Sequence, residues 1–192
     1  MSTIRAFIAI DLPEAVRKRI ASMGRELAQS GADVRWVREQ NLHLTLKFLG
    51  NIEEDRLDSA TRIVRDATAR LRPFDMQLHG TGVLPGRKRP RVVYVGAGAP
   101  VELFQLAGML GGALDPPEPP GRRFLPHITI GRVRSGKAVE RLVKELDRHD
   151  DTHFGEFTVK EAVIYESVLG RNGPTYTVRA NAPLGGAFSP KD

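Results

Sequence analysis

Two short stretches of this 192-residue chain contain the residue types that acid–base chemistry needs. In NLHLTLKFLG, His43 and Thr45 alternate with leucines, and in PHITIGRV, His127 and Thr129 alternate with isoleucines. Residues i and i+2 of a strand share a face, so each histidine is predicted to point the same way as its threonine, with the aliphatic side chains directed into a core. One such motif is ordinary on a half-exposed strand, whereas two copies indicate a common purpose.

The duplicated pair of residue types suits transfer at phosphorus. Two imidazoles on opposite sides of one reacting atom can serve as a general base and a general acid. The threonine hydroxyls beside them can donate hydrogen bonds to anionic oxygens. One histidine would deprotonate water while the other protonates the leaving oxygen. No carboxylate cluster or third histidine stands nearby at metal-ligand spacing, so this scheme predicts neither a metal nor a cofactor.

Composition narrows the class of protein. The chain is 41% hydrophobic and 27% charged, which is typical of a globular protein, and its net charge of +6 favours anionic partners such as nucleic acid or acidic lipid. Without cysteine it has no disulfide, thiolate nucleophile or zinc–thiolate site, as suits the cytoplasm. The apolar run at the N-terminus is interrupted too early for a signal peptide, and no run approaches the roughly 18 residues of a membrane span. We therefore expect a cytoplasmic protein without a membrane partner.

Hydrophobic periodicity predicts the elements that must position the two motifs. Apolar and β-branched runs predict strands at 5–12, 34–37, 42–49, 74–86, 91–98, 127–133, 157–167 and 174–180. Apolar residues three or four positions apart predict helices at 14–29, 54–71, 101–114 and 138–149. Helices interleaved with hairpins favour an α+β fold with antiparallel sheets. We expect one domain over residues 1–180, followed by a disordered tail at 181–192.

Four segments, RAFIAIDLP, VRWVREQNLHLTLKFLG, FLPHITIGR and YESVLGRNGPTYTV, resemble the two-histidine phosphoesterase superfamily. The resemblance covers about residues 4–179 and is to the bacterial and archaeal RNA 2′,3′-cyclic phosphodiesterases, historically called 2′–5′ RNA ligases. It implies a bilobal fold of two pseudo-twofold-related antiparallel sheets flanked by helices, with one motif from each lobe lining a central cleft. The implied substrate is RNA ending in a 2′,3′-cyclic phosphate, tRNA fragments among the candidates, which is opened to a 2′-phosphate. Weak reverse 2′–5′ ligation is also implied, and we expect a monomer.

The resemblance also implies residue roles. His43 matches the acid on the leaving 3′ oxygen and His127 the base that activates water, although the near symmetry of the motifs leaves this direction open from the residues alone. The implied substrate-binding residues are Thr45, Thr129 and Arg132 for the phosphate and Phe48 for the terminal base. Strict alternation would place Phe48 and Arg132 on the face opposite the histidines. We therefore predict a bulge, or the end of the strand, after each threonine.

A basic turn offers further contacts for RNA. PGRKRPR at 85–91 is either a solvated hairpin turn or, in an enzyme acting on RNA, a grip on phosphates without base specificity. The candidate contacts are Arg87, Lys88, Arg89 and Arg91, together with Arg122 and Arg123. The histidine chemistry also allows two other functions, a phosphodiesterase of small cyclic nucleotides and a non-catalytic protein that binds RNA ends.

Other patterns favour ordinary structural roles. GRVRSGKA at 131–138 reads like a nucleotide-binding loop, but Ala138 stands where a hydroxyl would be needed for magnesium, so a basic turn before a helix is predicted. HDDTH at 149–153 is predicted to be an exposed loop rather than a metal site. Core packing is the default expectation for Trp36 and Tyr94.

Overall fold

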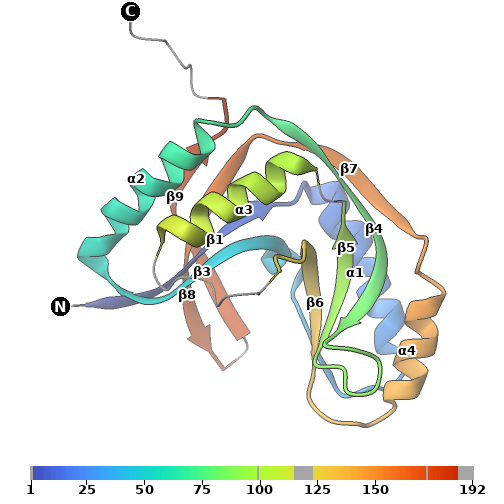
Figure 1. Cartoon of the computed structure of the whole chain (residues 1–192). Coiled ribbons are helices and arrows are strands. Elements are labelled where there is room, and N and C mark those ends of the chain that lie inside the picture. Colours follow the sequence, from blue (N-terminus) through green and yellow to red (C-terminus); the bar gives the residue numbers. More distant parts are fainter. Residues whose placement is uncertain (1, 99, 115–122, 172, 186–192) are drawn as a thin grey trace, which may run out of the picture.

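Helices and antiparallel strands alternate along the chain in the computed structural model, which describes residues 2–98, 100–114, 123–171 and 173–185 (Figure 1). The strands are β1 (Thr3–Asp11), β2 (Val34–Trp36), β3 (His43–Glu53), β4 (Phe74–Leu84), β5 (Val92–Ala97), β6 (His127–Val133), β7 (His153–Val159), β8 (Glu161–Gly170) and β9 (Gly173–Pro183). The helices are α1 (Glu14–Ala28), α2 (Leu57–Thr68), α3 (Val101–Ala113) and α4 (Val139–Asp147), with short 3₁₀ turns η1 (Glu39–Asn41) and η2 (Glu54–Arg56). The predicted α+β class is confirmed.

The strands form one curled antiparallel sheet (Figure 1). Its order is β7-β4-β5-β6-β3-β1-β8-β9, and β2 also pairs with β6. We call β3, β1, β8 and β9 the first half-sheet, and β6, β5, β4 and β7 the second half-sheet. The one residue pair that joins them in the described part of the sheet is Leu44 of β3 with Ile128 of β6. The two predicted sheets are thus two halves of one sheet, each contributing one histidine strand at the junction.

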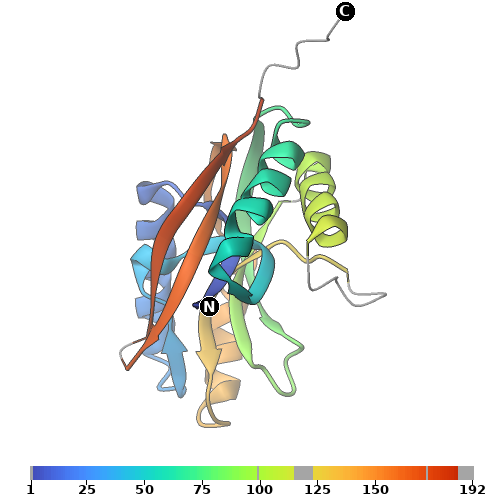
Figure 2. The same ribbon diagram turned by 90° about the vertical axis from the view of Figure 1, so that its left-hand side faces the viewer.

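Each half-sheet is covered by a pair of helices, and the two pairs lie on opposite sides of the molecule (Figures 1 and 2). Helices α2 and α3 pack on the first half-sheet and α1 and α4 on the second. Helix α1 shows why these segments are helical: it buries Val16, Ile20, Met23 and Leu27, the predicted apolar stripe, at spacings of three and four residues. Among the described residues, no helix is long and apolar enough to cross a membrane.

The chain passes repeatedly between the two half-sheets. Helix α1 follows β1 of the first half-sheet but packs against β6 and β7 of the second. Helix α3 lies between β5 and β6 in sequence but packs against α2 and β3. Consequently, neither half-sheet and its helices correspond to a continuous segment of sequence.

Two sequence predictions need correction near the C-terminus. The single strand predicted at 157–167 is two strands, because β7 pairs with β4 at one edge of the sheet whereas β8 pairs with β1 and β9. No glycine or proline stands between them to reveal the break. The predicted tail begins too early, since β9 continues to Pro183 and buries Ala182 against the core. Residues 186–192 lie outside the described residues.

Candidate active site

The two histidine motifs meet at the junction of the half-sheets. Leu44 and Ile128, the central aliphatic residues of the motifs, pair across the junction and are completely buried. Their flanking histidines and threonines therefore emerge together on the other face of the sheet, where all four are partly exposed. Residues flanking an antiparallel pair face one another, so each histidine lies opposite the threonine of the other motif. A local twofold axis passes through the junction and relates the histidine and threonine of one motif to those of the other.

Matching backbone hydrogen bonds orient the two imidazoles. The Nδ1–H of His43 donates to the carbonyl of Asn41 at 2.8 Å, and that of His127 donates to the carbonyl of Leu125 at 2.7 Å. A carbonyl can only accept, so the proton of each neutral ring is on Nδ1 and a lone pair is left on Nε2. The Thr45 hydroxyl lies 3.1 Å from Nε2 of His43. Both rings are thus held in the tautomer in which Nε2 can accept a proton.

A bulge follows each threonine, as predicted. Thr45 and Lys47 pair with adjacent residues of β1, which leaves Leu46 as the extra residue of β3. The same register shift in the pairing of β6 with β5 makes Ile130 the extra residue after Thr129. A bulge shifts the alternation of side chains by one position, so residues beyond it exchange faces.

The bulges bring Phe48 and Arg132 to the face that carries the histidines. Phe48 is 51% exposed, and Arg132 is exposed as well. The Phe48 ring lies 6.2 Å from Phe7, whose own ring lies 4.8 Å from His43. Both side chains are therefore accessible and on the side of the sheet that their proposed roles require.

Aromatic side chains that the sequence analysis did not assign to the site surround His43. Phe7 and Tyr176 approach its ring at centroid distances of 4.8 and 5.4 Å, and Tyr165 stacks on Phe7 at 5.3 Å. The Tyr165 hydroxyl donates to the Asp11 carboxylate at 2.7 Å. Burial raises the pKa of the Tyr165 hydroxyl, and the hydrogen bond to Asp11 raises it further. The two tyrosines belong to YESVLGRNGPTYTV, a segment that carries the family resemblance without indicating which residues reach the site.

The start of β9 is anchored two residues before Tyr176. The carbonyl of Pro174 accepts hydrogen bonds from Arg38 at 2.7 Å and from the Asn41 side chain at 2.9 Å. Burial raises the pKa of the Tyr176 hydroxyl, and nearby guanidinium groups, Arg132 first among them, oppose that shift. Arg132 of the second half-sheet is therefore close to a side chain that contacts His43 of the first.

On the other side of the junction, Tyr94 packs against His127. The two rings meet edge to face at 5.6 Å. Gly82 of the adjacent strand makes room for this tyrosine, since a Cβ there would come within 2.5 Å of the Tyr94 ring. The default expectation of core packing is thus incomplete, because Tyr94 also forms one wall beside the second histidine.

Burial lowers the pKa of His43 below its ordinary value of 6.5, and the Asn41 carbonyl and the Asp11 carboxylate oppose this shift. The unfolded chain therefore binds more protons than the folded one in the range between the two pKa values. The free energy of unfolding is expected to fall as pH decreases below about 6.5, by at most about 1.4 kcal/mol per pH unit, and the contribution levels off below the folded pKa.

This pH dependence can be assigned with two variants in urea unfolding between pH 5 and 7.5. His43→Gln should remove this part of the slope, whereas His153→Gln, at an exposed histidine where β7 begins, should keep it. An unchanged slope in His43→Gln would contradict the assignment.

The basic turn between β4 and β5 lies near the Arg132 end of β6. Arg87, Lys88, Arg89 and Arg91 line a groove of about 980 Å³ together with Arg132, the turn after β6 and one side of α4. Arg123 is exposed on the segment that leads into β6, and Arg122 lies outside the described residues. The predicted basic loop is thus brought together with the predicted phosphate-binding arginine.

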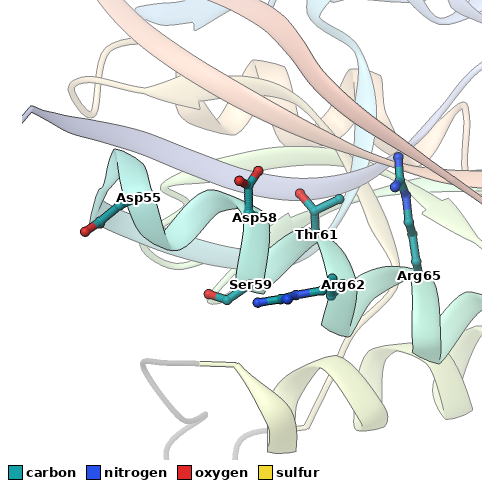
Figure 3. Close-up of a pocket in the computed structure, with 6 residues that line it drawn as sticks. All are labelled: Asp55, Asp58, Ser59, Thr61, Arg62 and Arg65. Atoms are coloured by element: carbon teal, nitrogen blue, oxygen red, sulfur yellow. The ribbon is translucent and has the colours of Figure 1, made fainter.

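One remaining pattern overlaps the end of the second histidine strand, and a hollow lies along α2. GRVRSGKA forms the end of β6 and the turn before α4, with Ala138 in the left-handed region at φ 52°. A hollow of about 480 Å³ runs along α2, where Arg62 extends back toward Ser59 (Figure 3). The other residues that line this hollow are Asp55, Asp58, Thr61 and Arg65. Among the described residues, no group of three or more His, Asp or Glu side chains is arranged to hold a metal ion.

Comparison with known proteins identifies relatives over nearly the whole chain. The family model described as LigT like Phosphoesterase matches residues 10–94 and 97–176. The RNA 2′,3′-cyclic phosphodiesterase of Methanothermobacter thermautotrophicus is 32% identical over 91% of this chain and 95% of its own. The crystal structure of TT0787 of Thermus thermophilus superposes with a TM-score of 0.79 at 30% identity, covering 95% of this chain and 99% of that one.

A third relative has been solved with a nucleotide. Escherichia coli LigT complexed with 3′-AMP superposes with a TM-score of 0.72 at 27% identity, again over 95% of this chain and 99% of that one. These likenesses extend over both half-sheets and both histidine strands. The chain belongs to the LigT-like phosphoesterases of the two-histidine superfamily.

Proposed function

We propose that this protein hydrolyses the 2′,3′-cyclic phosphate at the end of an RNA and leaves a 2′-phosphate. The observation that carries the proposal is the Leu44–Ile128 pair, which brings two histidine–threonine motifs to one face around a local twofold axis. Relatives that match nearly the whole chain are named RNA 2′,3′-cyclic phosphodiesterases, which supports the same substrate class.

In the proposed mechanism the phosphorus lies between the two imidazoles. Nε2 of His127 takes a proton from water as its oxygen attacks phosphorus, and Nε2 of His43 gives a proton to the leaving 3′ oxygen as the P–O3′ bond breaks. The products are a free 3′-hydroxyl and a 2′-phosphate. Both proton transfers are supplied by histidines, so the reaction needs no metal ion. With the 5′-hydroxyl of a second RNA in place of water, His127 would take its proton as its oxygen attacks the cyclic phosphate, and His43 would protonate the leaving 3′ oxygen. The product of this variant of the reaction would be a 2′–5′ linkage.

The surroundings of the two histidines fit these roles. The Thr45 and Thr129 hydroxyls and the Arg132 guanidinium stabilise the negative oxygens of the phosphate in the transition state. In the free protein, burial favours neutral His43. An anionic phosphate bound beside the ring raises its pKa, so the acid acquires its proton when the substrate is present. Phe48, exposed on the same side, offers a surface on which the terminal base can stack.

The test is turnover of a short RNA ending in a 2′,3′-cyclic phosphate, in EDTA, with the products separated as 2′- and 3′-phosphates. We expect opening to the 2′-phosphate without added metal. Formation of the 3′-phosphate would contradict the assigned leaving group, and loss of activity in EDTA would contradict the two-histidine mechanism. Turnover of small cyclic nucleotides but not of RNA would indicate a nucleotide phosphodiesterase, and binding without any turnover would indicate an RNA-end-binding protein.

A further inference from the structure

The basic groove between the β4–β5 turn and α4 is distinct from the two histidine motifs but shares Arg132 with the proposed phosphate-binding group. Its lining comes from three separate segments: the turn at 87–91, residues 132–136 after the second motif, and the exposed side of α4. Arg132 belongs both to this groove and to the proposed phosphate-binding group. Arg132 therefore links the groove to the proposed active site.

The charges in the groove favour an anionic polymer. Seven cationic side chains line it, against two acidic ones: Arg87, Lys88, Arg89, Arg91, Arg132, Arg134 and Lys144, with Glu140 and Asp147. One acid is already neutralised, since Arg87 forms an ion pair with Asp147 at 2.6 Å. That pair also ties the turn to α4. The surplus of positive charge thus faces a groove whose volume of about 980 Å³ exceeds what one phosphate fills.

The backbone holds the ends of the cationic turn in place. The N–H of Arg91 donates to the Leu84 carbonyl at 2.7 Å, and the Arg91 carbonyl accepts from Val133 at 3.0 Å. The N–H of Arg134 donates to the Asp33 carbonyl at 2.8 Å. Two basic segments are thereby fixed side by side.

Strand β6 connects the second histidine motif to the groove. Arg132 stands five positions after His127 on β6, and the bulge at Ile130 brings the two closer than the roughly 16 Å of a regular extended strand. A cyclic phosphate held at the histidines leaves its RNA chain to continue in the 5′ direction. We propose that the groove binds the phosphates of the nucleotides on the 5′ side of the terminal one, so that the protein prefers RNA chains over mononucleotides. This inference rests on the proposed function.

The experiment compares kcat/KM for an RNA of about eight nucleotides with that for a nucleoside 2′,3′-cyclic phosphate. The variant Lys88→Gln/Arg89→Gln/Arg134→Gln removes three exposed cations of the groove and leaves Arg132 in place. We expect the ratio of the two values to fall about tenfold or more at low salt. The logarithmic salt dependence of kcat/KM for the RNA should become shallower by about 2, since each lost phosphate contact to a single strand contributes about 0.7.

The matched control removes the same charge from the opposite side. Arg62→Gln/Arg70→Gln/Arg72→Gln changes three exposed cations on and just after α2, which covers the first half-sheet (Figure 1). This variant should keep the wild-type ratio. An equal loss in both variants, or a ratio unchanged in the groove variant, would overturn the inference while wild-type turnover leaves the proposed function standing. Absence of turnover with either substrate in the wild type would overturn both.

Discussion

Replacing either His43 or His127 with alanine is expected to lower kcat for opening an RNA 2′,3′-cyclic phosphate by about 10²- to 10⁴-fold. Each substitution removes one proton transfer, and general acid or base catalysis contributes about that much. The substrate's phosphate still has the threonine hydroxyls and Arg132, so KM should change less than kcat. The double variant should be little worse than the single ones, because groups that act in one step are not additive.

His79→Ala is the matched control, since it makes the same chemical change at an exposed histidine of β4. It should retain wild-type kcat. A substrate in which sulfur replaces the leaving 3′ oxygen separates the two roles, because a thiolate departs without needing a proton. Such a substrate should restore turnover to His43→Ala and not to His127→Ala. Rescue of the other variant instead would reverse the assignment of acid and base, and wild-type kcat in either variant would remove that histidine from the mechanism.

Leu44→Ala is expected to destabilise the protein by about 2–5 kcal/mol, the usual cost of emptying a fully buried leucine site. The site is also the junction of the half-sheets, so the loss should change the spacing of the two histidines. We therefore expect kcat to fall as well, under conditions where the variant remains folded. Urea unfolding measures the first effect and steady-state kinetics the second.

Two leucines elsewhere serve as controls for this variant. Leu110→Ala removes an equally buried side chain from α3 and should cost comparable stability with kcat preserved. Leu169→Ala, at a residue 67% exposed, should change stability by no more than about 0.5 kcal/mol. Equal kcat losses in Leu44→Ala and Leu110→Ala would show that the junction has no special part in aligning the site.

The parts of the site that follow from local alternation could be predicted from the sequence. A strand period of two places each histidine beside its threonine. The same period puts Phe48 and Arg132 on the opposite face of the sheet unless a bulge intervenes. The register shifts after Thr45 and Thr129 are at the predicted places. Here the conflict between regular alternation and the implied roles of Phe48 and Arg132 predicted where the two bulges lie.

The walls of the site could not be predicted in this way. Phe7, Tyr165 and Tyr176 come from three different strands, and periodicity along one strand carries no information about its neighbours. A break between two strands is equally hard to predict from sequence when neither glycine nor proline marks it, as between β7 and β8. Both failures concern which segments meet, which depends on the whole sheet.

The repeated passage of the chain between the half-sheets has a consequence for how the catalytic arrangement arises. Each half-sheet can be completed only by segments that are distant in sequence, so the protein has a high contact order, and folds of this kind form slowly. A single cut in the chain would leave neither half with its own strands and helices, and we expect the two halves to unfold in one cooperative transition. The histidines should therefore come together only late in folding, and the protein should acquire its activity and its global stability in the same step.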